Sequence, residues 1–448
     1  METAFKDDAS HLELLLDRVE RELENGLVPA EIFGSDIVFK AEMDRIFTRN
    51  WVFVAHESEI PEPGDYVLRR IGLDQVLVTR GSKGEINVIS NLCRHRGTRI
   101  CEADKGNAKQ FRCPFHGWIY RNNGDRMGAP HASRAYSNLD NSQWGLLRAP
   151  AVDSFHGLIF ASLSADVPPL REFLGGAAWM FDACLGLHPN GMRVTGPPDR
   201  FRIRSDWKLS GEFGGDNYHV DSAHISVQEI GLASKLREVA DHAYLYEMGN
   251  GHSFIGHGFT RWVSPEMELW GYPDDVKAGF DLSNLDEQQR QMITHRPPVT
   301  ASIFPNFNYL RFIGTYDPSK PPAIYTTIRQ WQPVAPGVIE LWSWHLAWNF
   351  ASQDYAEASY AAAAYNFGSG GIFEEDDTIS WEGPSEAARS PWGQAVGMSL
   401  NYQMGEGMSQ HEIDREWKGP GIVRKSGFGE QSIVAYYKHW VKEMKRGY

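Results

Sequence analysis

Two histidines five positions apart, His219 and His224, could bind the same metal ion. On a slightly loosened helix both imidazoles reach one point, and histidine is a common nitrogen ligand of iron and zinc. Two ligands leave such an ion under-coordinated, so a third ligand must come from elsewhere in the chain. The pair alone is a weak indication, because ordinary helices often carry two unrelated histidines.

A second set of metal-binding side chains lies more than a hundred residues upstream. It consists of Cys93-Arg-His95 and Cys113-Pro-Phe-His116, separated by a gap of seventeen residues. Each half sits between short β-type runs, so we expect both halves on loops. The four side chains could hold one tetrahedral zinc ion, or a [2Fe–2S] cluster in which both His bind one iron and both Cys the other. One Cys paired with one His in each half, instead of a Cys-x-x-Cys knuckle, favours the cluster.

The elements that must position these residues fall into two kinds of region. Between about 40 and 160, short β-type runs alternate with turn residues such as Pro63-Gly64 and Asn123-Gly124, which predicts a small antiparallel β domain. The rest of the chain mixes helical and strand-like patterns, which predicts an α+β domain with an antiparallel sheet. Helices are expected at 12–25, 36–49, 351–367 and 431–445 and around 216–224, and strand-like stretches at 201–204, 300–312, 322–332 and 338–348.

Length and composition limit the class of protein. The chain has 448 residues, enough for about two or three domains, and its 42% apolar and 23% charged fractions are typical of globular proteins. A net charge of −14 argues against a nucleic-acid partner. No apolar run approaches the roughly 20 residues of a membrane span, and the N-terminus lacks the features of a signal peptide. We therefore expect a cytoplasmic protein without a membrane partner.

Three segments taken together resemble the large (α) subunits of Rieske non-haem iron aromatic-ring-hydroxylating dioxygenases. The two Cys/His segments, extended to Gly97 and to Gly117-Trp118, resemble the Rieske motif, and Asp216-x-x-His219-x-x-x-x-His224 resembles the iron site. The segment Phe373-Glu-Glu-Asp-Asp377-x-x-x-Trp381 resembles the part of the family that supplies the third ligand. The resemblance implies a Rieske domain inserted near the start of a helix-grip catalytic domain. The boundaries would be 1–38 for an N-terminal helical part, 39–160 for the Rieske domain and 161–448 for the catalytic mononuclear iron domain.

The same resemblance implies two iron centres. The ligands of the [2Fe–2S] cluster would be Cys93, His95, Cys113 and His116. A mononuclear Fe(II) would be held by His219, His224 and Asp377, a 2-His-1-carboxylate triad that leaves positions open for O₂. Asp377 belongs to an acidic run that is also typical of a solvated face, and Asp376 remains an alternative ligand.

Asp216 would connect the two centres. In the family that the chain resembles, the two metals of one chain are too far apart for electron transfer, and an Asp links a cluster His to an iron His across subunits. Carried over, Asp216 would hydrogen-bond His219 in its own chain and His116 of the next chain in the assembly. Carboxylates of this kind fix the tautomer and basicity of a ligating histidine. The alternative role for Asp216 is a helix N-cap.

A substrate pocket follows from the same comparison. Its expected residues are Glu212, Phe213, Leu310, Phe373 and Trp381. Aromatic and aliphatic walls suit a flat apolar ring, although each residue could also belong to the core. Glu212 stands where relatives usually carry an amide, which is a departure from the family. Arg311 could pair with a substrate carboxylate, or could simply lie at a surface or strand edge.

The implied activity is cis-dihydroxylation of an aromatic ring with O₂ and two electrons. Electrons would come from NAD(P)H through a ferredoxin and a separate reductase, since the chain has no Gly-rich dinucleotide fingerprint after a strand. The implied assembly is a homotrimer of α, or α₃β₃ with a small β subunit. Three alternatives stay open at this point. They are a salicylate-type monohydroxylase acting on an aromatic acid, a Rieske electron carrier, and a zinc-stapled binding protein.

Overall fold

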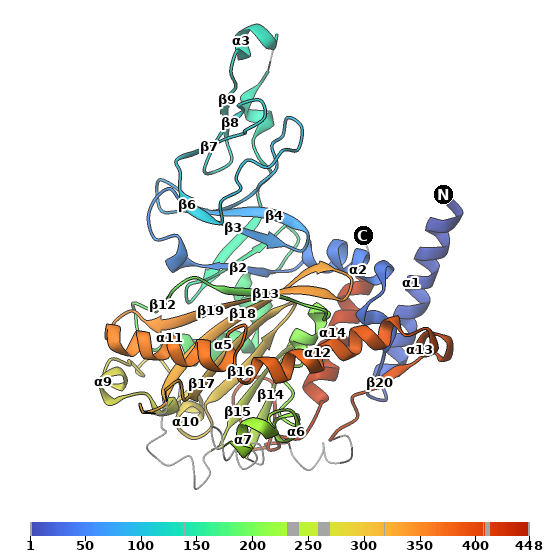
Figure 1. Cartoon of the computed structure of the whole chain (residues 1–448), viewed down its shortest axis with the longest axis vertical. Coiled ribbons are helices and arrows are strands. Elements are labelled where there is room, and N and C mark those ends of the chain that lie inside the picture. The colour runs from blue at the N-terminus through green and yellow to red at the C-terminus, as the bar shows by residue number, and fades with distance from the viewer. Residues whose placement is uncertain are drawn as a thin grey trace. The chain divides into compact units, whose positions relative to one another are not determined.

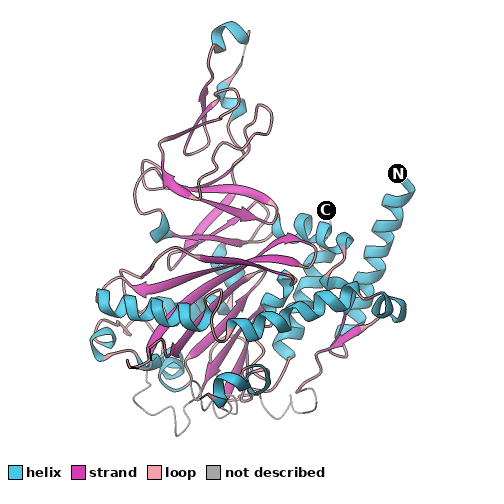
Figure 2. Cartoon of the chain, viewed as in Figure 1, coloured by secondary structure: helices cyan, strands magenta, loops and turns pink. Residues whose placement is uncertain are grey.

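Two compact units make up the chain. The computed structural model describes residues 2–137, 139–230, 242–258, 269–317, 319–405, 407 and 413–446. One unit is Phe47–Leu170, and the other combines Met1–Ile46 with Arg171–Tyr448. The first consists mostly of short strands, whereas the second combines helices with a large antiparallel sheet (Figure 2). The predicted α+β class is therefore confirmed.

The Phe47–Leu170 unit is built from three small antiparallel sheets. The first sheet contains β2 (Val52–His56), β10 (Ala151–Phe155) and β11 (Leu158–Ser162). The second contains β3 (Asp65–Ile71), β4 (Asp74–Arg80), β5 (Ile86–Ser90) and β6 (Lys105–Asn107). The third contains β7 (Gln110–Arg112), β8 (Ile119–Arg121) and β9 (Arg126–Gly128). Three single-turn helices complete the unit: η3 (Glu57–Glu59), α3 (Ala132–Ala135) and η4 (Asn141–Trp144).

The core of this unit is aromatic and includes two of the candidate ligands. Cys93 and Cys113 are buried in one cluster with Phe111, Trp118 and Tyr120. Because the second and third sheets both contribute to this cluster, the loops that follow β5 and β7 are fixed to the same core. The hydrophobic packing of the unit thus holds the two Cys/His segments against each other.

A nine-stranded antiparallel sheet forms the centre of the other unit. Its strand order is β12-β19-β18-β17-β16-β15-β14-β21, with β13 paired to β19. The early strands are β12 (Met192–Val194), β13 (Asp199–Ile203), β14 (Ala243–Gly249), β15 (His252–His257) and β16 (Pro298–Ile303). The later strands are β17 (Phe307–Gly314), β18 (Ala323–Ala335), β19 (Val338–Trp348) and β21 (Ile422–Arg424). A separate ribbon pairs β1 (Leu27–Pro29) with β20 (Ser399–Asn401).

Helices cover this sheet and frame the ends of the chain. Those of the N-terminal half are α1 (Glu2–Leu23), η1 (Ala30–Phe33), α2 (Asp36–Glu42), a π turn η2 (Met43–Phe47), α4 (Leu170–Leu174), α5 (Gly176–Leu185), η5 (Trp207–Gly211), α6 (Val220–Ala223) and α7 (Ile225–Glu229). The remainder are α9 (Asp274–Lys277), α10 (Glu287–His295), α11 (Gln353–Phe367), α12 (Glu374–Arg389), α13 (Pro391–Val396) and α14 (Gln431–Lys445). Within the described parts of the chain, every helix is too short or too polar to cross a membrane.

Small residues explain how α11 reaches the sheet. Ala356, Ala362 and Ala363 are buried on one side of this helix, which packs on β17, β18 and β19. Side chains this small allow close approach, and Leu310 and Tyr325 from the sheet fill the contact. In Figure 1, α11 and α12 lie in front of the sheet. Because α12 begins only a few residues after α11 ends, the packing of α11 on the strands also positions the start of α12.

The predicted elements at 300–312 and 36–49 differ from those observed. The strand-like stretch 300–312 is two strands, β16 and β17, joined by a turn at Phe304–Asn306. Pro305 cannot donate to a strand ladder, which agrees with a break at this point. The helix expected over 36–49 ends at Glu42 and continues as a π turn to Phe47, where the chain enters the other unit.

A buried ion pair fixes the segment that leads into the second candidate site. Lys208 and Glu42 are fully buried, and Lys208 Nζ donates to Glu42 Oε1 at 2.7 Å. The same ammonium lies 2.7 Å from Asp206 Oδ1. The indoles of Trp207 and Trp440 donate to the two oxygens of Glu42 at 2.8 and 3.0 Å. Since every polar atom of Glu42 has a partner, this network ties α2, η5 and α14 together at one point.

Candidate metal centres and substrate cavity

Two loops of the Phe47–Leu170 unit present the Cys and His residues in the same way. In the first loop, Cys93 N donates to Thr98 O at 2.9 Å, and Gly97 N donates to Cys93 O at 2.8 Å. Cys113 repeats this pattern with Trp118 O at 2.8 Å and with Gly117 N at 3.0 Å. Gly97 and Gly117 have φ values of 76° and 70°, which glycine adopts without strain. Both loops are therefore tight turns closed by glycine directly after the candidate ligands.

The four side chains meet between these turns. The rings of His95 and His116 lie 4.5 Å apart between centroids, and His95 stacks on Trp118 at 5.0 Å. Both cysteines are buried, while both histidines are partly exposed. Burial raises the pKa of the Cys93 thiol, and Tyr120 OH lies 3.3 Å from its Sγ. A thiolate at this buried position requires a bound cation, as a metal cluster would provide.

The pairing of the four side chains favours a cluster over a single zinc ion. Zinc binds Cys at about 2.3 Å and His at about 2.0–2.1 Å, with all four ligands around one ion. Here the rings of His95 and His116 lie side by side, and Cys93 and Cys113 are buried together in one core cluster. Two irons, one bound by both His and the other by both Cys, match this pairing of like residues. The residues present therefore fit a [2Fe–2S] cluster.

The segment carrying His219 and His224 is not the continuous helix that the sequence suggested. The two histidines flank the four-residue helix α6, and a second short helix, α7, begins after His224. Asp216 Oδ1 accepts from Tyr218 N at 2.8 Å and from His219 N at 3.3 Å. A side chain that binds its own backbone in this way competes with helix formation, which explains the turn before His219.

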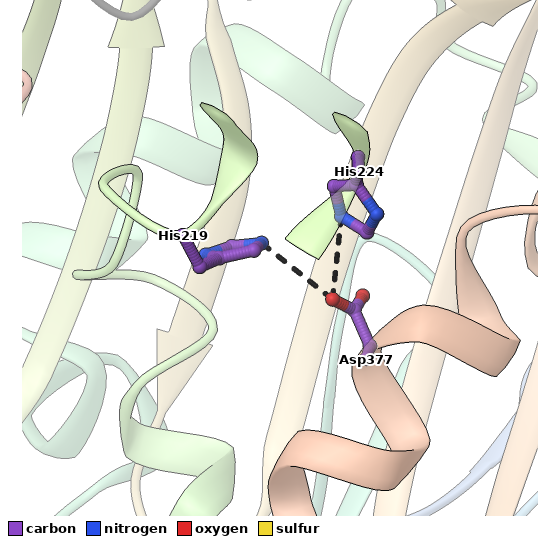
Figure 3. Close-up of side chains that lie close together, drawn as sticks. All are labelled: His219, His224 and Asp377. Carbon is purple, nitrogen blue, oxygen red and sulfur yellow. Dashed lines mark ion pairs between the residues drawn. The ribbon is translucent and has the colours of Figure 1, made fainter. Parts of the chain in front are cut away.

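A carboxylate from a distant helix completes the second site. Asp377 Oδ1 lies 3.6 Å from His219 Nε2 and 3.3 Å from His224 Nε2 (Figure 3). Ligand atoms of these three residues all lie within 4.8 Å of one another. Two imidazole nitrogens and one carboxylate on one side of a shared point match the facial triad that binds Fe(II). The donor set and its spacing therefore fit a mononuclear iron.

The acidic run at the start of α12 is divided among three tasks. Glu374 is fully buried and pairs with Arg329, which is also fully buried, at 2.5 Å. Asp376 Oδ2 lies 3.3 Å from Nδ1 of His224, on the side of the ring away from Asp377. The Glu374 pair anchors the first turn of α12, so Asp377 faces both histidines. In this geometry Asp376 orients the ring of His224, and Asp377 is the carboxylate within reach of the ion.

Asp216 contacts the outer nitrogen of the other histidine. Its Oδ2 lies 3.1 Å from His219 Nδ1, and both side chains are about one-third exposed, at 32% and 35%. Burial raises the pKa of Asp216, but hydrogen bonding to His219 and the charge of that ring outweigh it and lower the pKa. Asp216 thus closes the turn and holds His219 in one orientation at the same time.

A cavity of about 190 Å³ opens beside the triad. All five expected pocket residues line it, namely Glu212, Phe213, Leu310, Phe373 and Trp381. A cavity of about 150 Å³ is known to accept benzene, so this volume suits a single ring with a short substituent. Ile255, His257, Thr300 and Phe312 also line the cavity, although nothing in the sequence pattern marks them. Their strands are buried nearly throughout, so the pattern of residue types does not indicate which face lines a cavity.

Glu212 is an unusual wall for an apolar cavity. Its Oε1 accepts from Tyr402 OH at 2.7 Å and from Tyr437 OH at 3.3 Å. The pKa of Glu212 is raised to about 7, mainly by burial. The nearby carboxylate of Asp216 also raises this pKa, and the hydrogen bonds from the two tyrosines lower it. A large share of this side chain is therefore a neutral acid near pH 7. In that state it offers one hydrogen-bond donor and one acceptor, as the amide that the family resemblance led us to expect here would.

Arg311 occupies neither of the positions considered from sequence. It is fully buried, with its guanidinium 4.5 Å from the ring centroid of Trp270, and Nε donates to Thr326 Oγ1 at 3.0 Å. Neighbours along a strand point to opposite faces, so Leu310 faces the cavity and Arg311 faces away. Arg311 does not line the cavity. It is therefore not a surface residue, and it is not placed to bind a substrate carboxylate there.

Comparison with known proteins extends over almost the entire chain. The Rieske [2Fe-2S] domain family matches residues 50–151. The chain is 45% identical to the N,N-dimethyl phenylurea N-demethylase subunit alpha of Sphingobium sp. (strain YBL2), over 99% of this chain and 97% of that protein. It is 30% identical to the large oxygenase component of the naphthalene 1,2-dioxygenase system of Ralstonia sp, over 91% and 89%. The crystal structure of naphthalene 1,2-dioxygenase from Rhodococcus sp. bound to indole matches with a TM-score of 0.89 and 34% identity, over 96% and 97%.

Proposed function

Because the chain belongs to the family of Rieske non-haem iron oxygenase large (α) subunits, we propose that it is the terminal oxygenase that inserts oxygen from O₂ into an aromatic substrate. One observation carries this proposal. The triad of His219, His224 and Asp377 borders an apolar cavity of the size of a substituted ring. An electron carrier has no need of such a cavity, and a zinc-stapled protein has no need of the second site.

Each site has a separate task. The Rieske cluster and the mononuclear iron that this family uses supply, when bound, single electrons and a site for O₂. Cys93, His95, Cys113 and His116 would hold the cluster. The protein itself orients the ligating imidazoles, through Asp216 at His219 and Asp376 at His224. The aromatic walls formed by Phe213, Phe373 and Trp381 exclude water and hold the ring of the substrate beside the triad.

Cis-dihydroxylation of the ring is the reaction that we place first. Relatives of this chain include the large oxygenase component of a naphthalene 1,2-dioxygenase system and the biphenyl 2,3-dioxygenase subunit alpha. Phe213, Leu310 and Phe312 provide flat apolar contacts for a ring. The buried position of Arg311 removes the basis for an aromatic-acid monohydroxylase, since that alternative needed a cationic anchor in the cavity.

Oxidative N-demethylation is the second candidate, and the 45% identity to a phenylurea N-demethylase subunit favours it. It would use the same two sites, but one oxygen atom would enter an N-methyl group and that carbon would leave as formaldehyde. The ring would stay intact. The two reactions therefore differ in which carbon of the substrate is held beside the triad.

The partners of the oxygenase belong to the same proposal. We expect a ferredoxin and an NAD(P)H reductase, assembly as α₃ or α₃β₃ with a small β subunit, and a cytoplasmic location where NAD(P)H is available. The relatives are described as a large oxygenase component and a subunit alpha, so those proteins have further components. In the assembly, Asp216 would hydrogen-bond both His219 of its own chain and His116 of a neighbouring subunit, so that electrons pass from the cluster to the mononuclear iron across this bridge.

Product analysis tests the function. The iron-loaded protein, supplied with a reductase and ferredoxin, is incubated under ¹⁸O₂ with toluene in one series and with N,N-dimethyl-N′-phenylurea in another. A cis-diol carrying two labelled atoms supports dihydroxylation, and formaldehyde with the monomethyl product supports N-demethylation. His219→Ala should abolish both, whereas His295→Ala, at the exposed end of α10, should not. Turnover that survives in His219→Ala would contradict the assignment of the site.

A further inference from the structure

Two polar side chains in the substrate cavity have no hydrogen-bond partner within the described part of the chain. They are His257, whose Nε2 is buried and unbonded, and Thr300, whose Oγ1 is buried and unbonded. Both residues line the cavity beside the iron triad. Buried polar atoms are almost always hydrogen-bonded in native proteins, and the free hydrogen-bonding capacity of these two lies at a cavity wall, where a bound ligand would satisfy it.

The register of the sheet places the two residues on adjacent strands, on either side of an irregularity after Ile255. Thr300 on β16 is the cross-strand partner of Ile255 on β15, and Thr300 also pairs with Leu310 on β17. His257 is two residues beyond Ile255, so both point to the same face of the sheet. His257 and Thr300 are therefore diagonal neighbours on adjacent strands. Ile255, Leu310 and Phe312 surround them with apolar contacts on the cavity side.

We propose that His257 and Thr300 form a polar subsite that recognises a neutral carbonyl or amide substituent on an aromatic substrate. An imidazole nitrogen and a hydroxyl can each donate or accept a hydrogen bond. Together they match the N–H and C=O of an amide. The inference rests on the proposed function and deepens it, because it names the substrate class that the same cavity takes.

The charge state of the subsite selects against an acid. Burial lowers the pKa of His257 to about 4, so its imidazole is uncharged near pH 7. The one arginine considered as an anchor, Arg311, faces the opposite side of the sheet. A carboxylate substituent would have to give up its hydration here for two neutral hydrogen bonds, whereas a neutral amide loses much less. The subsite therefore suits an anilide or arylurea better than an aromatic acid.

Aromatic side chains on either side of His257 and Thr300 indicate which part of the ligand these two residues bind: a polar substituent, and not the ring itself. Phe373 packs edge-on against His224 at 4.9 Å between ring centroids, and Phe312 packs against His257 at 6.2 Å. A ring lying among these phenylalanines has apolar surroundings on its faces. A hydrogen-bonding group at its edge reaches the strand wall that carries His257 and Thr300.

Paired ligands test the subsite without turnover. Acetanilide and butylbenzene are similar in size, but only acetanilide carries an amide. Their dissociation constants are measured by anaerobic calorimetry on the iron-loaded holoenzyme, and the readout is the ratio between the two. Thr300→Val removes the hydroxyl at nearly constant volume, and His257→Phe removes the imidazole nitrogens. Each variant should shift the ratio about ten-fold toward butylbenzene, which is the loss of one hydrogen bond, while Thr300→Ser should restore the preference.

Two controls separate the outcomes. Thr294→Val, in α10 and outside the cavity, should leave the ratio at the wild-type value. A ratio within two-fold of wild type in both Thr300→Val and His257→Phe would overturn the subsite. If the ratio shifts as expected but neither reaction product forms with a reductase and ferredoxin, the proposed function fails and the subsite stands. If products form and the ratio does not shift, the subsite fails alone.

Discussion

Asp216→Asn is the substitution that most directly tests how the protein prepares the mononuclear site. His219 faces Asp377 through Nε2, so its other nitrogen, Nδ1, faces the charged Oδ2 of Asp216 at 3.1 Å. The second oxygen of Asp216 accepts from two backbone N–H groups at 2.8 and 3.3 Å. An amide of the same shape has only one oxygen for these two tasks. If it keeps the backbone bonds, its NH₂ group faces the N–H of His219.

The expected size of the effect follows from this loss. A hydrogen bond to a charged group contributes about 1.5–3 kcal/mol and a neutral one about 0.5–1.5 kcal/mol. Both side chains are one-third exposed, so we take no more than the difference between like ends of the two ranges, about 1–1.5 kcal/mol. Since about 1.4 kcal/mol is a factor of ten, the iron affinity of Asp216→Asn should fall about ten-fold. Losses of 10–100-fold are typical when a partner of a ligating histidine is removed.

Iron affinity is measured by anaerobic equilibration with graded amounts of a chelator, counting the irons that remain per chain. Asp281→Asn is the matched control, because Asp281 accepts from Ser283 N at 2.9 Å in a similar turn but lies outside the cavity. A dissociation constant of Asp216→Asn within two-fold of wild type would refute the reasoning. The electron path is tested separately at saturating iron. If reoxidation of the reduced cluster is then as fast as in wild type, Asp216 positions His219 but does not carry electrons.

Three further substitutions address the remaining groups. Cys93→Ser should abolish the visible absorbance of the cluster and all turnover, and an unchanged spectrum would rule out Cys93 as a ligand. Asp377→Ala should release the mononuclear iron and spare the cluster; full iron occupancy would transfer the ligand role to Asp376. Glu212→Gln should change the pH dependence of stability in iron-depleted protein, because the folded-state pKa of about 7 lies above the ordinary value of 4.5. The folded wild type keeps a proton that the unfolded chain loses, so its stability falls as pH rises through 7. The variant should match wild type below about pH 4.5 and exceed it by about 1–3 kcal/mol at pH 8, measured by denaturant titration; parallel curves would show that the pKa of Glu212 is the same in the folded and the unfolded chain.

Residues whose roles depend on local chain geometry could be predicted well. Each Cys/His loop of the Rieske-like site is closed by a glycine a few residues after its cysteine, so ligand types and turn residues are visible together. The same is true of α14, whose observed bounds, Gln431–Lys445, are those expected from its apolar period. In both cases neighbours along the chain provide most of the interactions that decide the structure.

Contacts between residues far apart in the sequence decided which of two neighbouring carboxylates faces the candidate iron site. Asp376 and Asp377 are adjacent and chemically alike, and only the Arg329–Glu374 pair and the position of α12 turn one toward His224 Nδ1 and the other toward both Nε2 atoms. The turn before His219 was also missed, because a helical spacing and an Asp-closed turn both allow two histidines to converge.

The sequence by itself indicated which residue types could bind metal, their grouping into two candidate centres, the α+β class and the family. Only the tertiary structure decided which faces of the strands form the cavity. Leu310 and Arg311 are neighbours with opposite surroundings, and His257 and Thr300 meet only because β15 and β16 pair in one register with an irregularity after Ile255. A shift of one residue in a strand exchanges its two faces, and the register is set by partners more than forty residues away in the chain. The local sequence pattern therefore does not indicate which face of a strand lines the cavity.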